Sequence, residues 1–184
     1  MNRIALVTGI GAATCLALKA AGYQVVANYF GNDAEAKEFA SASELPVYAC
    51  DVADLDACAK GVTEVTAKHG PVDVLVNNAG ITADAMLHKM TGEQWRSVID
   101  IDLGGCFNMC RTVIEGMRGR HFGRIVNISS VNGLSGQAGQ TNWPNDLIAV
   151  QKRQPIEQKE NTIISLSRTP EHAPEAFLAS MLVL

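Results

Sequence analysis

The residues best suited to chemistry in this chain lie where short apolar runs end. The apolar run Ile4–Thr8 is followed at once by Gly9, Ile10 and Gly11. A glycine-rich turn between a strand and a helix lets the backbone approach a pyrophosphate, which then rests on the helix N-terminus. A single Gly-x-Gly is also common in ordinary tight turns. The turn by itself therefore leaves both interpretations open.

The cysteines and histidines indicate little metal or redox chemistry. Five cysteines are an odd number without the spacing of a disulfide framework, so we expect reduced and mostly buried thiols. Cys106 and Cys110 share a helix face, but no second pair stands at ligand spacing, and we interpret them as small core residues. The histidines show no metal-ligand spacing either: His69, His88, His121 and His172. We therefore expect no metal site.

Alternating strand-like and helix-like segments must position these residues. The strand predictions are Ile4–Thr8, Gln24–Tyr29, Val47–Cys50, Val72–Asn77 and Arg124–Ser129. The helix predictions are Ala12–Ala21, Asp33–Ser43, Leu55–His69 and Gly92–Met117. Strands that are apolar throughout and separated by helices are typical of a parallel sheet covered on both faces. The fold class is therefore α/β, a doubly wound, Rossmann-like parallel sheet with right-handed crossovers.

The composition changes near residue 140. All 16 glycines lie at or before Gly139, whereas four of the six prolines fall in the last 44 residues. In that stretch we predict a helix that is capped by Asn142, has Pro144 near its first position and runs to about Gln154, a strand over Thr162–Leu166 and a helix over Glu175–Leu184. We expect a dinucleotide-binding domain over residues 1–142 and a divergent tail over residues 143–184, with the C-terminal part of the fold truncated or altered.

Composition also limits the partners. A chain of 184 residues suits one domain with a sizeable core, and its net charge of −4 without a basic run argues against nucleic acid. No apolar stretch reaches the ~20 residues that span a bilayer, so we expect no membrane partner. The run at residues 4–7 is too short for a signal peptide, which predicts a cytoplasmic protein.

Several motifs carry a family resemblance. Thr8-Gly9, Asn77–Gly80 and Arg124–Ser130, in this order and spacing, resemble the short-chain dehydrogenase/reductase family. Longer phrases are similar to its acetoacetyl-CoA reductase branch: Asn77–Thr82 with Asp84, His88–Thr91, Phe122–Gly133 and Gly136–Asn142. The resemblance covers residues 1–142. It implies NADPH-dependent reduction of a 3-oxoacyl-CoA to a 3-hydroxyacyl-CoA, a place in polyhydroxybutyrate biosynthesis, and a homo-oligomer built on the long helix Gly92–Met117.

The resemblance also implies roles for individual residues. The cofactor would contact Gly9, Ile10 and Gly11 at the pyrophosphate, Asp51 and Val52 at the adenine, and Asn78, Ala79 and Gly80 on the ribose and nicotinamide side. The second strand ends in Asn28-Tyr29 instead of an acid, which favours NADP over NAD. The acyl-CoA pocket would be lined by Asp84, Gln137 and Gln140, whose alternative interpretation is ordinary loop polarity.

The catalytic positions depart from the family pattern. Ser130 matches the family serine, but the tyrosine, lysine and asparagine positions hold Trp143, Leu147 and Asp102. An indole N–H donates a hydrogen bond without releasing its proton near neutral pH, and Leu147 supplies no charge. Loss of positioned acid–base catalysis costs ~10²–10⁴ in rate. The phosphate turn also lacks four residues of the family pattern T-G-x-x-x-G-I-G, which leaves little room for a pyrophosphate.

These departures keep other functions open. One alternative is a catalytically silent nucleotide-binding or scaffold protein, and another is a non-functional product altered near residue 142. A hydrolase that pairs Ser130 with His121 is a remote fourth interpretation, because no G-x-S-x-G elbow is present. A reductase of the acetoacetyl-CoA type remains the leading interpretation.

Overall fold

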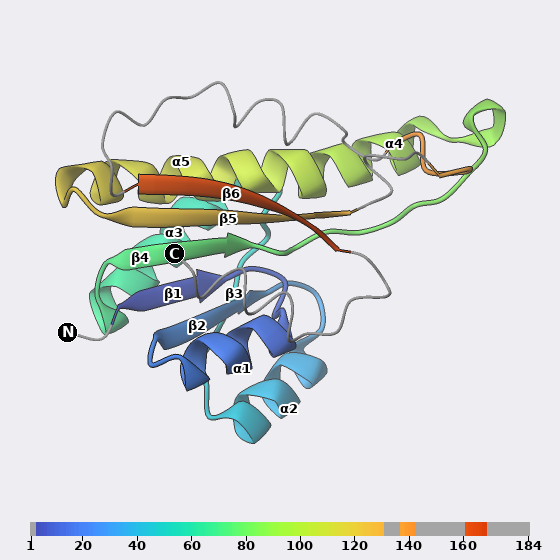
Figure 1. Ribbon diagram of the computed structural model, residues 1–184. Coiled ribbons are helices and arrows are strands. Elements are labelled where there is room, and N and C mark those ends of the chain that lie inside the picture. Colours follow the sequence, from blue (N-terminus) through green and yellow to red (C-terminus); the bar gives the residue numbers. More distant parts are fainter. Residues whose placement is uncertain (1–2, 131–136, 143–160, 169–184) are drawn as a thin grey trace.

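The computed structural model describes residues 3–130, 137–142 and 161–168, which contain one parallel sheet of six strands (Figure 1). The strand order is β3-β2-β1-β4-β5-β6, and every neighbouring pair runs parallel. The strands are β1 (Ile4–Val7), β2 (Gln24–Tyr29), β3 (Val47–Ala49), β4 (Val72–Asn77), β5 (Gly123–Ser130) and β6 (Asn161–Arg168). This order confirms the Rossmann-like α/β fold, with its topological switch point between β1 and β4.

Helices cover both faces of the sheet. They are α1 (Ala12–Ala20), α2 (Asp33–Ser43), α3 (Leu55–His69), α4 (Gly92–Val98) and α5 (Gly105–Gly119), with a short 3₁₀ turn, η1 (Leu87–Lys89), before α4. Figure 1 shows α1 and α2 together below the sheet and α5 running along β5. Among the described residues, no helix is long and apolar enough to cross a membrane.

Two cores form because successive side chains of each strand point to opposite faces. Along β1, Ile4 and Leu6 join α3 and α5, whereas Ala5 and Val7 join α1. The first core also takes Met109, Val113 and Met117 from α5, and the second takes Cys15 and Leu18 from α1. This burial on both faces explains why the strands are apolar throughout.

Side-chain caps fix where three of the helices begin. Asn32 accepts the Glu35 N–H before α2, and Asp54 accepts the N–H groups of Asp56 and Ala57 before α3. Thr91 and Gln94 form a reciprocal capping box at the start of α4. Each cap satisfies amides that have no partner inside the helix.

The long helix predicted over Gly92–Met117 is not continuous. Between α4 and α5 the chain forms a π-helical segment, η2 (Ile99–Gly104). Its end is marked by Gly104 and Gly105, and a Cβ at position 105 would lie 2.8 Å from a methyl carbon of Val52. Glycine thus allows the start of α5 to approach the loop after β3.

The C-terminal predictions have mixed outcomes. The strand expected over Thr162–Leu166 is confirmed as β6, which pairs along its whole length with β5. The helix over Glu175–Leu184 lies outside the described residues, and so does the helix predicted to run to Gln154, of which only the capping residue Asn142 is described.

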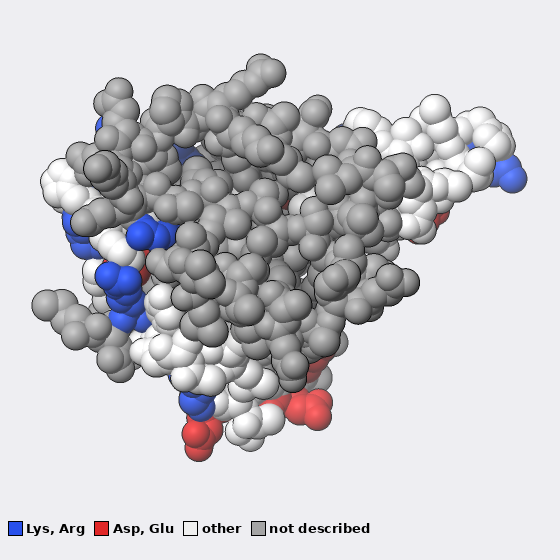
Figure 2. Space-filling view, in the orientation of Figure 1, with Lys and Arg blue, Asp and Glu red and all other residues white. Residues whose placement is uncertain are grey.

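Basic side chains gather at the edge where the strands begin. Figure 2 shows a group of Lys and Arg side chains on that side of the visible face. Arg3 and Arg124 stack on the Phe122 ring, with 3.8 and 4.9 Å between guanidinium carbon and ring centroid. Arg120 lies 3.6 Å from the Asp73 carboxylate and donates to the Val72 carbonyl at 2.7 Å. These contacts close the end of the sheet away from the carboxyl ends of the strands.

A buried hydroxyl joins β1 to β4 at the opposite end. The Oγ1 atom of Thr8 accepts the backbone N–H groups of Asn78 and Ala79, each at 3.0 Å. The Thr8 N–H donates to the Val76 carbonyl at 3.0 Å, and the residue is 1% exposed. Thr8 therefore continues the strand pairing past the last residues of β1.

We predict that Thr8→Val lowers the free energy of unfolding by about 2 kcal/mol, because two buried amides lose their acceptor while the side-chain shape is kept. Thr8→Ser is the matched control, since it keeps the oxygen and loses only a methyl group. Urea unfolding followed by circular dichroism measures both. Equal stability of the valine and serine variants would contradict this role.

Candidate functional site

The predicted phosphate turn lies at the switch point, between the end of β1 and the start of α1. All three of its residues have left-handed backbone conformations, with φ angles of 66° for Gly9, 61° for Ile10 and 49° for Gly11. A β-branched residue is strained in this region, at a cost of about 1–2 kcal/mol for Ile10. The short turn thus reaches α1 only through an unusual backbone path.

Two backbone N–H groups of the turn are already hydrogen-bonded within the chain. The Ile10 N–H donates to the Asn28 carbonyl at 2.8 Å, and the Gly11 N–H donates to the Gly9 carbonyl at 2.7 Å. The first intrahelical bond of α1 runs from the Cys15 N–H to the Gly11 carbonyl. The amides that helix geometry leaves for an anion are therefore those of residues 12–14, at the positive end of α1.

The two glycines of the turn are packed against the residues after β4. A Cβ at position 9 would lie 2.8 Å from the Cα of Ala79, and one at position 11 would lie 3.0 Å from the side-chain nitrogen of Asn78. That nitrogen donates to the Thr8 carbonyl at 3.0 Å. Gly9 is thus required by the approach of the Ala79 backbone, and Gly11 by the Asn78 and Val7 side chains.

The predicted adenine contacts lie beside the end of β2. The Asn28 side-chain nitrogen donates to the Cys50 carbonyl at 2.9 Å, so the loop after β3 is held against β2. One carboxylate oxygen of Asp51 accepts the Ala53 N–H at 2.9 Å. The Val52 carbonyl accepts from the Asn108 side chain of α5 at 2.9 Å. Asn28, Asp51 and Val52 are therefore brought together at this edge, as the sequence predicts.

Asp102 of η2 faces the strip Asn78–Gly80. Its Oδ1 accepts the Ile81 N–H at 2.9 Å, and a Cβ at position 80 would lie 3.4 Å from the same oxygen. Its Oδ2 is buried with no partner. Burial raises the pKa of the Asp102 carboxyl to about 6, although the Ile81 N–H opposes this. The family asparagine would place a neutral amide here.

The predicted acyl-CoA residues come from two distant segments that the fold joins. The Gln140 side chain donates to the Asp84 carboxylate at 3.1 Å, and the Ala85 N–H donates to the Gly139 carbonyl at 2.8 Å. Gln137 is exposed and its carbonyl accepts the Gln140 N–H at 3.1 Å. Asp84, Gln137 and Gln140 are thus neighbours.

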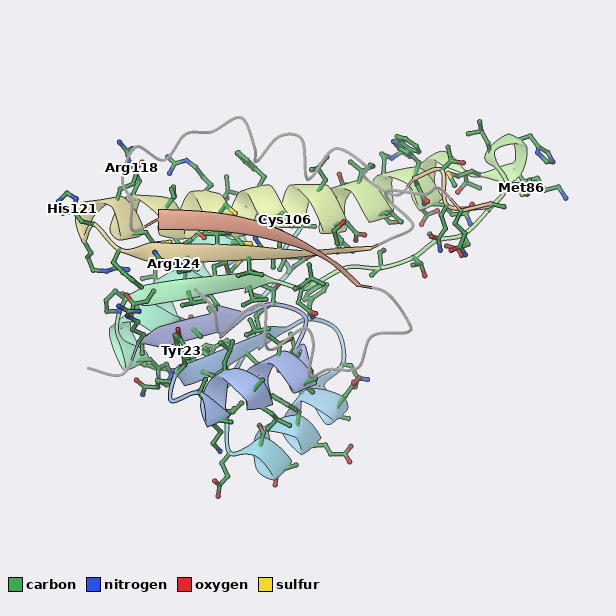
Figure 3. The ribbon with its side chains drawn as sticks, in the orientation of Figure 1. Tyr23, Met86, Cys106, Arg118, His121 and Arg124 are labelled. Atoms are coloured by element: carbon green, nitrogen blue, oxygen red, sulfur yellow. The ribbon has the colours of Figure 1, made fainter. Side chains whose placement is uncertain are left out.

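We call residues 83–94 together with residues 137–142 the arm. It extends from the carboxyl edge of the sheet, with Met86 near its tip (Figure 3). Asn142, which is 2% exposed, joins the two parts: its side-chain nitrogen donates to the carbonyls of Ala83 and Gln94 at 3.2 and 3.1 Å. The arm therefore presents the candidate substrate residues as one unit.

The catalytic positions are only partly described. Ser130 is the last residue of β5, where its backbone is paired with Arg168 of β6. Trp143 and Leu147 lie outside the described residues. His121 precedes β5, so a strand of eight residues, about 25 Å long, separates it from Ser130. This separation excludes the hydrolase pairing of His121 with Ser130.

Two residues of the site were not singled out from the sequence. Thr8 carries a signal, a hydroxyl residue between a buried strand and a glycine, but its two amide partners come from a segment 70 residues away. Asn142 was predicted only as a helix cap. Its burial depends on contacts with residues 83 and 94, which no local pattern reveals.

A parallel sheet with this switch point, and a helix that begins beside it, defines a Rossmann-like α/β protein, a class in which ligands bind at the switch point. Comparison with known proteins narrows the class. The family model for short chain dehydrogenase matches residues 3–144, and the chain belongs to this family.

Similar curated proteins include acetoacetyl-CoA reductases. The chain is 60% identical over 147 residues to an acetoacetyl-CoA reductase of Rhizobium meliloti (strain 1021), a match that covers 78% of this chain and 61% of the relative. Acetoacetyl-CoA reductases of Shinella zoogloeoides and Paracoccus denitrificans are 58% and 57% identical over the same shares. The chain thus spans about 61% of the length of these relatives.

The family implies a nicotinamide cofactor, and the donor set at the edge fits one. The first-turn amides of α1 suit a pyrophosphate, and the residues at the ends of β2, β3 and β4 lie on both sides of it. The fit is poorest at the turn, because the amides of Ile10 and Gly11 are already bonded within the chain.

We predict that four residues inserted between Gly9 and Ile10, with the sequence Ser-Ser-Arg-Gly, tighten NADPH binding at least about tenfold. The longer turn frees amides for the pyrophosphate, and the arginine adds a charge for the 2′-phosphate. A Ser-Ser-Ser-Gly insertion is the matched control that separates the two effects. Fluorescence titration with NADPH measures the dissociation constants. Unchanged binding in both insertions would contradict the turn's assignment.

We also predict that Asp102→Asn removes a pH dependence of stability. The folded-state pKa of about 6 lies above the ordinary value, so the native state binds the extra proton and stability falls as pH rises from about 4 to 6. The asparagine variant should be more stable than the parent at pH 8, by on the order of 2 kcal/mol, and similar at pH 4.

Asp100→Asn, which changes an exposed carboxylate on the same segment, is the control and should keep the parent's pH profile. Thermal unfolding at several pH values measures all three proteins. An unchanged profile in Asp102→Asn would refute the buried carboxyl as its source.

Proposed function

We propose that this protein is an oxidoreductase that reduces acetoacetyl-CoA to 3-hydroxybutyryl-CoA, with NADPH as hydride donor. The observation that carries the proposal is the identity of 57–60% to acetoacetyl-CoA reductases over 147 residues, which include both segments of the arm. The contact between Asp84 and Gln140 supports it further, because it gathers polar groups beside the edge where the cofactor would lie.

The cofactor would be held along the carboxyl edge of the sheet and would supply the hydride. Asp51 and Val52 would contact the adenine, and the α1 amides would face the pyrophosphate. Asn78, Ala79 and Gly80 would border the ribose and nicotinamide. Asn28 supports NADPH over NADH, because no carboxylate ends β2 to repel a 2′-phosphate.

The substrate would bind beside the arm. Carboxylate and amide groups at Asp84, Gln137 and Gln140 suit the amide groups of a pantetheine chain, which donate and accept hydrogen bonds. Ser130 would hold the carbonyl oxygen of the substrate.

The protein should turn over slowly. The family's acid is a tyrosine supported by a lysine, and this chain has Trp143 and Leu147 at those positions. Without a group that releases a proton, the expected loss is about 10²–10⁴ in rate.

The remaining assignments follow from the same proposal. We propose a cytoplasmic homo-oligomer that associates through α4 and α5, where Trp95 and Phe107 are 43% and 62% exposed. We also propose that the reductase-like part ends near residue 142, close to the end of the family match at residue 144.

The test is NADPH oxidation that depends on acetoacetyl-CoA, followed by loss of absorbance. We predict that Trp143→Tyr with Leu147→Lys raises the rate by about 10²–10⁴, since the pair restores the acid and its supporting charge. Adding Ser130→Ala should remove the gain.

Two outcomes would count against the proposal. A double variant that binds NADPH but shows no substrate-dependent rate would favour a silent nucleotide-binding protein. A folded protein with no NADPH binding, even with the lengthened turn, would overturn the cofactor assignment as well.

A further inference from the structure

Two thiols meet directly behind the predicted adenine contacts. The sulfur of Cys50, just after β3, lies 3.7 Å from the Asp51 carbonyl oxygen, and the sulfur of Cys58 on α3 lies 3.6 Å from the same oxygen. Cys58 also lies 3.5 Å from the Val52 carbonyl. Both sulfurs therefore occupy one small volume.

A glycine on α3 brings them together. A Cβ at position 61 would lie 3.4 Å from the Cβ of Cys50 and 3.5 Å from its sulfur. Gly61 is one helical turn after Cys58, on the same face of α3. The bare backbone at Gly61 lets the Cys50 side chain approach the helix within reach of Cys58.

The two thiols differ in reactivity. Cys50 is 8% exposed and Cys58 is 0% exposed, so a small oxidant reaches Cys50 first. A hydrogen bond from the Cys58 thiol lowers the pKa of Cys50 more than burial and nearby carboxylates raise it. The same pairing raises the pKa of Cys58. Cys50 therefore provides the attacking thiolate, and Cys58 is placed as the resolving thiol.

We propose that Cys50 and Cys58 are a modification site, oxidised to a disulfide by a hydroperoxide, and that the disulfide weakens nucleotide binding at Asp51 and Val52. The second part rests on the function proposed above. Because the sulfurs lie on the core side of the loop, the oxidation acts on the nucleotide edge without touching the nucleotide.

The chemistry is balanced with hydrogen peroxide as the oxidant. The Cys50 thiolate attacks one peroxide oxygen, the O–O bond breaks, and the products are Cys50 sulfenic acid and hydroxide, which takes up a proton to give water. The Cys58 sulfur then attacks the Cys50 sulfur, the S–S bond forms and the S–O bond breaks, and the sulfenic hydroxyl leaves with the Cys58 proton as a second water. Overall, two thiols lose two electrons and the peroxide is reduced to two waters.

The effect on the site follows from the length of the new bond. A disulfide requires about 2.05 Å between the sulfurs, shorter than any hydrogen-bonded contact of two thiols. Forming it draws the loop after β3 toward α3 and changes the contacts of the Cys58 sulfur with the Asp51 and Val52 carbonyl oxygens, which are 3.6 and 3.5 Å long in the reduced protein. The bonds that Ala53 and Asp54 make to Asp51, at 2.9 and 3.2 Å, loosen with the loop.

The test treats the full chain with hydrogen peroxide and then blocks remaining thiols with an alkylating agent. Peptide mapping by mass spectrometry should find Cys50 linked to Cys58, and dithiothreitol should reverse the link. NADPH titration should show affinity about tenfold weaker in the oxidised protein, the loss expected for one good hydrogen bond. Amide hydrogen exchange at Ala53 and Asp54 should become faster.

Matched variants identify the pair. Cys50→Ala and Cys58→Ala should each abolish the change in exchange and in NADPH affinity, and having both guards against one failing to fold. Cys110→Ala removes a thiol that is less buried than either and should leave the disulfide intact. If oxidation instead follows exposure alone, Cys110 reacts first and the proposal is overturned.

The two proposals fail separately. Absence of the link between Cys50 and Cys58, or a link that leaves hydrogen exchange unchanged, overturns this inference whatever the nucleotide does. A reduced protein that does not bind NADPH counts against the proposed function. In that case peptide mapping and hydrogen exchange still test whether the Cys50–Cys58 disulfide forms and loosens the loop.

Discussion

The candidate site depends on one buried hydroxyl. Thr8 Oγ1 accepts two amides from the segment after β4, and this contact holds the ends of β1 and β4 together at the switch point. The turn Gly9–Gly11 then packs directly on Asn78 and Ala79, and Asn78 in turn bonds the Thr8 carbonyl. The strip beside Asp102 begins at these same residues. A change at Thr8 would therefore move the phosphate turn and the strip together.

Most of the fold could be predicted because its causes are local. The strands are apolar throughout since both faces are buried, and the starts of α2, α3 and α4 carry their own capping residues. The π-helical segment Ile99–Gly104 could not be predicted, because the helix periodicity of its flanks hides it. Its position is fixed by the close approach of Gly105 to Val52, a contact between segments 53 residues apart in sequence.

The sequence predicted some parts of the candidate site and not others. The predicted residues Asn28, Asp51, Asn78 and Gly80 all lie at the carboxyl edge of the sheet, because each ends or follows a predicted strand. The shortened turn was visible in the sequence, but the engagement of its amides by Asn28 and Gly9 depends on backbone geometry. The joining of Asp84 to Gln140 and the meeting of Cys50 with Cys58 depend on packing between elements, so neither spacing nor composition revealed them.

The arm also has a consequence for the order of folding. Its pairing of Ala85 with Gln140 closes a chain segment that contains α4, η2, α5 and β5. Closure of so long a loop is entropically costly until the intervening elements have already brought the ends together. The arm must therefore assemble after β5 has added to β4. During synthesis the arm cannot form until residue 142 has left the ribosome, and of the described elements only β6 emerges later.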